Sequence, residues 1–370
     1  MSTSVKTSHA ELITHRIHFD PFAAAKAAST RLPAVQIPAT FWDGLQPTVN
    51  RITVKPGSPL PKADVLVITW TTAEAQTLSA VFTSNHDFEA TWYPYTYGAQ
   101  SLLSEIPAVL LNQKANADSL GKGIIGYFNV VTVNGKTVVL FKSELHPSED
   151  GNQLPVIGLI TQAAAEVAPS LLITTGTAGA IGSSLEAGDA VITNTARFYL
   201  TNPASYAAYP GITNSVQLTA PPINFSSTYI TKCNQQITTL IESDLTTIAK
   251  EKNYPGPTRN PTIFFNNVPG TKVFDVVSSN GFSLDDKNDT DGLQQLGSVN
   301  DMDDAFILYG LGQNAGTAKL PWLSIRNISE PQAPNLLKAT QTEWEEMYDA
   351  YGMYTTYNSA FGCWAVICGL

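Results

Sequence analysis

Short apolar segments alternate with helix-forming segments along the chain from Ala63 onward. In the segments ADVLVITW, SLLITTG and PWLSIRNIS apolar residues stand at successive positions, so both faces of each strand would carry apolar side chains. Strands of this kind are typical of a sheet that helices cover on both sides, and the intervening helices favour parallel neighbours. The sequence therefore predicts an α/β fold with a mostly parallel sheet, in which a ligand binds at the carboxyl ends of the strands.

Periodicity and turn residues predict the other elements. We expect helices at TTAEAQTLSAVF, LPVIGLITQAAAEVAPS and MDDAFILYGLG, and C-terminal helices from about Lys338 to Leu370. Asn134-Gly135 predicts a hairpin turn in YFNVVTVNGKTVVLFKS, and we expect one strand each in GDAVITNTARFY and TKVFDVVSS. Residues 200–270 are rich in Pro, Asn and Ser, and we expect loops around one or two helices there.

Composition divides the chain into two regions. Residues 1–62 contain the helix-forming DPFAAAKAAS and the Pro-spaced RLPAVQIPATFWDGLQP, and we interpret them as an N-terminal extension. Phe41 and Trp42 are its expected anchors on the main domain, residues 63–370. A loosely ordered arm is the alternative.

Charge and cysteine usage narrow the classes of partner. The net charge is -10 and there is no basic run, which argues against a nucleic-acid partner. No segment approaches the roughly 18 to 20 apolar residues of a membrane helix, and the three cysteines lack metal-ligand spacing. We therefore expect a cytoplasmic protein with no membrane partner, no metal and no cofactor.

The segment LLITTGTAGAIGSSLEAGDAVIT carries glycines at positions 176, 179 and 182. This spacing fits neither the dinucleotide fingerprint nor the phosphate loop. It predicts a strand end where the backbone approaches a ligand with no Cβ in the way, with the Thr177 hydroxyl beside it. A tight structural turn is the alternative.

Four segments in chain order carry a family resemblance: TTGTAGAIGSSLEAGDAVI, VVSSNGF, NDMDDAF and IRNISE. With them the chain, from about Asp64 to Leu370, resembles the purine nucleoside phosphorylase / uridine phosphorylase superfamily. The resemblance implies a central mixed sheet flanked by helices on both faces, a small-molecule purine nucleoside as ligand, and a homo-oligomer. YNSAFGCWAVICGL fits either an oligomer interface or a terminal helix that faces the core.

The resemblance implies substrate-binding roles for seven residues. Met302 and Asp303 match the residues that hold the ribose, although Asp303 is one methylene shorter than the family's glutamate. Phe282 matches the aromatic residue that stacks on the base, and the others are Thr177, Ala178, Gly179 and Ser329. A carboxylate at a helix start is the alternative for Asp303, and a core residue is the alternative for Phe282.

The resemblance also implies catalytic roles for Glu74, Glu330 and Arg326. Glu330 falls where nucleosidases carry the aspartate that protonates the departing purine. Glu74 falls where the methylthioadenosine/S-adenosylhomocysteine nucleosidase branch carries the glutamate that activates water, and Thr177 and Arg326 match positions that flank this water. The alternatives are an exposed acid on the first helical turn for Glu74, a solvated loop acid for Glu330 and an ordinary ion pair for Arg326.

Hydrolysis and phosphorolysis differ in their need for a phosphate site. These relatives build that site largely from arginines, and no arginine occurs from Ala63 through Ala196. A carboxylate at Glu74 would repel phosphate. These features predict a metal-independent purine nucleosidase with water as nucleophile. A phosphorylase with an anion site built from lysines or from a neighbouring subunit, and a nucleoside-binding protein without activity, stay open alternatives.

Overall fold

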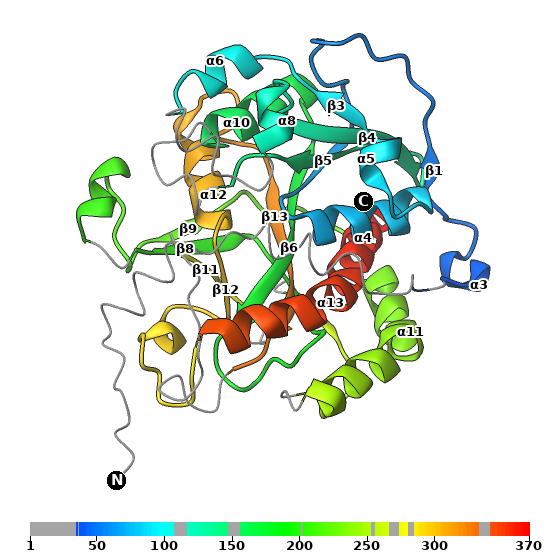
Figure 1. The fold of residues 1–370 in the computed structure, drawn as a ribbon, viewed down its shortest axis with the longest axis vertical. Helices are drawn as coiled ribbons and strands as arrows, with labels where there is room; N and C mark the ends of the chain where they lie inside the picture. Colours follow the sequence, from blue (N-terminus) through cyan, green and yellow to red (C-terminus); the bar gives the residue numbers. More distant parts are fainter. Residues whose placement is uncertain are drawn as a thin grey trace.

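The computed structural model describes residues 35, 37–106, 117–146, 156–200, 203–252, 256–265, 274–279, 285–332 and 341–370. Its strands form one sheet (Figure 1): β1 (Thr48–Val49), β2 (Val65–Thr69), β3 (Tyr93–Tyr95), β4 (Gly126–Val133), β5 (Lys136–Ser143), β6 (Leu171–Ala180), β7 (Ala190–Thr193), β8 (Thr195–Tyr199), β9 (Gln217–Thr219), β10 (Ile263–Phe265), β11 (Val276–Ser279), β12 (Val299–Asp301) and β13 (Trp322–Glu330). Its helices are α3 (Ala39–Trp42), α4 (Thr72–Thr83), α5 (Phe88–Thr91), α6 (Ala99–Leu103), α8 (Ala117–Gly121), α10 (Val156–Val167), α11 (Thr228–Lys252), α12 (Asp304–Gln313) and α13 (Gln341–Gly369), with 3-10 turns η2 (Pro203–Ala208) and η3 (Leu293–Gln295). None of the helices in these ranges is long and apolar enough to cross a membrane.

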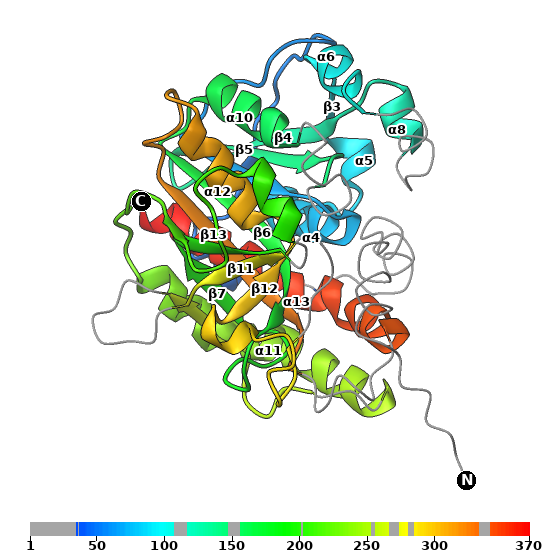
Figure 2. The ribbon, with the colours of Figure 1, turned by 90° about the vertical axis from the view of Figure 1, so that its left-hand side faces the viewer.

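Strand β6 is the centre of the sheet. β2 and β13 lie parallel to it on either side, and β5, β4 and β1 follow beyond β2. At its carboxyl end β6 also pairs with β12, from which the sheet continues through β11 and β8 to β9. Side chains of α4, α11 and α13 form the core on one face, and those of α10 and α12 form the core on the other (Figures 1 and 2). The ends of β2, β6 and β13 therefore meet at one edge, between two layers of helices.

The sheet is mixed, so the predicted α/β fold with helices on both faces is confirmed. The expectation of mostly parallel strands is wrong, because antiparallel pairs are as frequent as parallel ones among the described strands. Short connections can join only antiparallel neighbours. The turn between β4 and β5 is of this kind, with Asn134 (φ 46°) and Gly135 (φ 77°) in the left-handed region, as the sequence predicts.

The predicted helices at α4, α10 and α12 are confirmed. Two predictions differ from the structure. GDAVITNTARFY forms two strands, because the chain changes partners at Asn194: β7 lies beside β13, and β8 lies beside β11. The described part of the C-terminal region is a single helix, α13, and the region from 200 to 270 adds the strands β9 and β10 to its helix α11.

Phe41 and Trp42 are buried against the C-terminal helix. The Phe41 ring lies 4.7 Å from that of Phe361, and the Trp42 ring lies 5.4 Å from that of Trp364. Tyr357, Phe361 and Trp364 belong to the core, so the core-facing alternative for YNSAFGCWAVICGL is confirmed. The expected helix in DPFAAAKAAS lies outside the described residues, and the division at residue 62 stays a prediction.

Phe41→Ala is expected to lower the free energy of unfolding by about 3 to 5 kcal/mol, because it removes a fully buried ring. The measurement is urea unfolding followed by tryptophan fluorescence. Val49→Ala is the control, since Val49 is 43% exposed, and its effect should stay within about 0.5 kcal/mol. Equal stability of both variants would show that α3 does not belong to the folded domain.

Candidate active site

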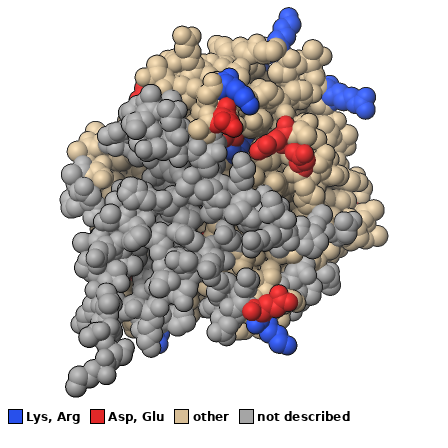
Figure 3. Space-filling model, viewed as in Figure 1, with Lys and Arg blue, Asp and Glu red and all other residues tan. Residues whose placement is uncertain are grey.

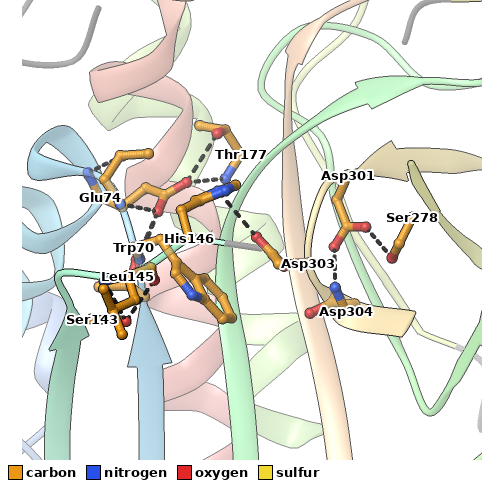
Figure 4. A network of polar contacts seen from close by, with 12 residues as sticks. Trp70, Glu74, Ser143, Leu145, His146, Thr177, Ser278, Asp301, Asp303 and Asp304 are labelled. Carbon is orange, nitrogen blue, oxygen red and sulfur yellow. Dashed lines mark hydrogen bonds and ion pairs between the residues drawn. The ribbon is translucent and has the colours of Figure 1, made fainter. Parts of the chain in front are cut away.

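Glu74 is a buried carboxylate that joins α4 to β6 (Figure 4). Its Oε2 accepts hydrogen bonds from the Thr69 hydroxyl (2.9 Å) and from the backbone N–H groups of Trp70 (3.2 Å) and Thr71 (2.9 Å). Its Oε1 accepts from the backbone N–H (2.8 Å) and the hydroxyl (2.9 Å) of Thr177. Glu74 does form a capping box with Thr71, but the alternative of an exposed acid is wrong.

The glycine at position 176 makes room for this carboxylate. A Cβ on Gly176 would overlap the Glu74 carboxyl group, with Oε2 only 2.9 Å away. β6 runs on to Ala180, so Gly176 and Gly179 lie within the strand and the turn begins only near Gly182 (φ 75°). The alternative of a tight turn is therefore wrong for the first two glycines: the backbone at Gly176 approaches a side chain of the protein itself.

Glu330 ends β13 and is also buried. The register between β13 and β6 shifts at Ser329, so that Ile328 lies opposite Ala178 and Glu330 opposite Gly179. The Ser329 hydroxyl donates to Oε2 (2.6 Å), whereas Oε1 has no hydrogen-bond partner in the described part of the chain.

Burial raises the pKa of Glu330 to about 7; the negative charge of Glu74 acts in the same direction, and the bond from Ser329 opposes it. The alternative of a solvated loop acid is wrong. Glu330 is a buried acid that can hold a proton near neutral pH.

Tyr348 of α13 joins this group and was not foreseen from the sequence. Its buried hydroxyl donates to the Thr71 hydroxyl oxygen (3.3 Å). Burial raises the pKa of Tyr348, and the charges of Glu74 and Glu330 add to the effect. The sequence signal is a tyrosine at every third position from 348 to 357, which predicts a buried helix face but not which hydroxyl lies near the carboxylates.

Arg326 lies on β13, 1% exposed, among three aspartates. Its guanidinium donates to both oxygens of Asp304 (2.9 and 2.6 Å) and to Asp303, and it lies 3.1 Å from Asp301 Oδ2. Its Cζ also lies 5.3 Å from the Trp70 ring. Burial opposes the charge of Arg326, but the three carboxylates outweigh it and raise the pKa of the guanidinium. Arg326 thus forms ion pairs with three carboxylates, and no contact between described residues joins it to Glu74.

Asp303 begins α12, but its side chain does not cap the helix. The Asp304 N–H donates to Asp301 Oδ2 instead (3.1 Å), so Asp303 stands at the helix start, as the alternative has it, but makes no capping hydrogen bond. Asp303 contacts Arg326, and its other oxygen lies 3.8 Å from Nε2 of His146 (Figure 4). His146 is buried, with its ring 6.4 Å from that of Trp70. His146 thus lies beside Asp303, the residue that matches the ribose ligand.

The carboxylates of Asp301, Asp303 and Asp304 lie within 4.8 Å of one another, a spacing that a metal ion would accept. The Arg326 guanidinium contacts all three and already balances part of their charge. Burial raises the pKa of Asp301 and Asp303, whereas Arg326 outweighs burial and lowers the pKa of Asp304. The cluster is therefore organised around an internal cation.

The structure gathers the site residues into two groups. The glutamate cluster consists of Thr71, Glu74, Thr177, Glu330 and Tyr348, and the arginine cluster consists of Trp70, His146, Asp301, Asp303, Asp304 and Arg326. Trp70 connects them: its backbone N–H donates to Glu74, and its indole ring lies against the Arg326 guanidinium. Of the other predicted ligands, Ala178 and Gly179 lie on β6, Ser329 binds Glu330, Met302 is partly buried, and Phe282 lies outside the described residues.

Arg326→Met is expected to cost about 3 to 5 kcal/mol of stability, because it leaves three buried aspartates without their cation. The loss should be larger at pH 8 than at pH 5.5. Without Arg326 the folded-state pKa values of Asp301 and Asp303 rise further above their unfolded values, and Arg326 no longer lowers that of Asp304, so stability is lost as pH rises through these pKa values. Urea unfolding at both pH values measures this.

Arg259→Met is the matched control, because the Arg259 side chain is 37% exposed and forms its ion pair with a single carboxylate, Asp189, among the described residues. We expect a smaller loss there. Equal losses for Arg326→Met at both pH values would contradict the charge balance described for the arginine cluster.

Comparisons with known proteins place the chain in a family. The model of the phosphorylase superfamily matches residues 115–351. The fold is similar to that of 5′-methylthioadenosine/S-adenosylhomocysteine nucleosidase from Neisseria meningitidis (13% identity, 83% of this chain and 99% of that chain, TM-score 0.48). It is also similar to that of futalosine hydrolase from Helicobacter pylori (12% identity, 82% of this chain and 96% of that chain, TM-score 0.46). A search of curated protein sequences gives no match. Since the family model matches more than half of the length of this chain, the chain belongs to the phosphorylase superfamily.

Proposed function

We propose that the protein hydrolyses the N-glycosidic bond of a purine nucleoside to free base and ribose, without a metal ion. The observation that carries the proposal is the pair of buried glutamates, Glu74 in the first turn of α4 and Glu330 at the carboxyl end of β13, whose charges interact. Bond cleavage requires a proton for the leaving base and groups that tolerate positive charge on the sugar. A buried acid with a raised pKa, Glu330, beside a second buried carboxyl group can meet both requirements.

Glu330 is the proposed acid. Its pKa of about 7 keeps much of it protonated at neutral pH, and its Oε1, which has no partner among the described residues, can present the proton to a ligand. As the C–N bond breaks, its electron pair goes to the base, and Glu330 gives its proton to a ring nitrogen. The Ser329 hydroxyl then stabilises the carboxylate that remains.

Glu74 is the proposed residue that orients water, together with Thr177. The five hydrogen bonds to Glu74 fix the position of the carboxylate beside β6. In the proposed reaction the water oxygen bonds to the anomeric carbon, and the carboxylate takes up the released proton. Because both oxygens already accept hydrogen bonds, a nucleoside-binding protein without turnover is the second candidate function.

The positive charges near the site support hydrolysis over phosphorolysis. Arg326 is engaged by three aspartates, and the buried Lys142, whose strand position is opposite Thr69, pairs with Glu144. On the face shown in Figure 3 the visible lysine and arginine side chains stand apart from one another. A phosphate dianion would therefore meet carboxylates without a free guanidinium in the described part of the site.

The sugar and base contacts rest on the resemblance. Asp303 is the proposed ribose ligand, with Met302 beside it, and Phe282 is the proposed stacking residue. The indole N–H of Trp70 is buried with no hydrogen-bond partner among the described residues, so it is available to a ligand between the two clusters. The purine base, the homo-oligomer and the cytoplasmic location stay predictions.

Product analysis tests the proposal. Adenosine, inosine, methylthioadenosine and AMP are incubated with the protein, with and without phosphate. We expect free base and an unphosphorylated sugar from at least one of them, at a rate that phosphate does not change. Ribose-1-phosphate formed only with phosphate would overturn hydrolysis, and tight adenine binding without any product would favour the binding protein.

Glu330→Gln is expected to lower kcat by about 100-fold or more, because general acid catalysis contributes about that much. In the unmodified protein kcat should fall as pH rises above about 7, since only protonated Glu330 can donate. Glu166→Gln is the control: Glu166 also accepts an N–H and a hydroxyl, but near the amino end of β6. A rate that rises through pH 8 would contradict the role of Glu330.

A further inference from the structure

We propose that Tyr348 of the C-terminal helix is a positioning residue for both glutamates: it holds Glu74 through Thr71 and stabilises the charge that forms on Glu330. The inference rests on the proposed function. It concerns a residue outside the segments that carry the family resemblance, on an element that reaches the site only through the fold.

Helix α13 packs against α4 and against β6 and β13 (Figure 1). This packing brings Tyr348 next to Thr71, 277 positions earlier in the chain. The Tyr348 hydroxyl donates to Thr71 Oγ1 (3.3 Å), and the same oxygen accepts the N–H of Glu74 (3.3 Å). The phenol thereby fixes the hydroxyl that begins α4, and with it the helix turn that carries Glu74.

The phenol can act only as a neutral donor. The charged groups that face it are Glu74 from α4 and Glu330 from β13, and both are acids. Burial and these two acids raise the pKa of Tyr348, so the hydroxyl keeps its proton throughout the range in which enzymes work. The hydroxyls of Thr71 and Thr177 complete its polar surroundings.

A neutral donor is useful at the moment of proton transfer. When Glu330 gives up its proton, it becomes a second negative charge close to Glu74 in a buried region. Such a pair is costly unless hydrogen-bond donors stabilise it. The Tyr348 hydroxyl donates its hydrogen bond to Thr71 and interacts with the charge of Glu330 as a nearby polar group, so its removal should make ionised Glu330 harder to form.

Tyr348→Phe tests the inference, with Tyr357→Phe as the matched control. Tyr357 is buried on the same helix and packs against Phe361, outside both clusters. We expect Tyr348→Phe to lower kcat about fivefold, the value of one hydrogen bond between neutral groups, with KM changed by less than about twofold. The decline of kcat at high pH should move to higher pH. Tyr357→Phe should change kcat and its pH profile by less than about twofold.

The titration of Glu330, followed by carbon-13 NMR without any substrate, gives an independent measurement. We expect it to move to higher pH in Tyr348→Phe and to stay unchanged in Tyr357→Phe. An active unmodified protein with equal kcat, pH profile and titration in the two variants would overturn the inference. If the unmodified protein cleaves no nucleoside, the proposed function fails, while an unchanged Glu330 titration in Tyr348→Phe still overturns the positioning role by itself.

Discussion

The bond between Glu74 and Thr177 fixes the first helix of the domain against the central strand. It joins residues 103 positions apart, and it depends on a glycine at 176, because any side chain there would displace the carboxylate. Burying a carboxylate is tolerated only where donors surround it, and five donors do so here. The resulting negative charge then acts on its surroundings: it adds to the burial that raises the pKa values of Glu330 and Tyr348.

The arginine cluster shows the opposite arrangement, in which one cation is enclosed by acids. Asp301, Asp303 and Asp304 share the Arg326 guanidinium, and the Trp70 ring lies against it. The Arg326 guanidinium is therefore engaged in ion pairs within the protein. The polar groups that remain in the described part of the site are mainly carboxyl groups and hydroxyls. This balance supports the proposed use of water rather than phosphate.

Local residue patterns were sufficient to predict many elements. Apolar runs located β2, β6 and β13, and Asn134-Gly135 located the hairpin between β4 and β5. The resemblance selected Glu74, Thr177 and Glu330, which the structure brings together, and Arg326 and Asp303, which it joins in a second group. The prediction of a mostly parallel sheet was wrong because strand direction depends on which neighbours pair. A tight turn stayed an open alternative for residues 176 and 179 because a glycine in a strand has the same local pattern.

The sequence by itself determined the class of fold, the family and the types of residue at the ends of the strands, since these follow from local periodicity and short motifs. Only the tertiary structure decided which of these residues are buried, which oxygen of Glu330 has no partner in the described ranges, and that Tyr348 and His146 belong to the two clusters. The physical reason is that proton affinity and hydrogen bonding depend on distances through space, and the partners here come from strands and helices that are far apart along the chain.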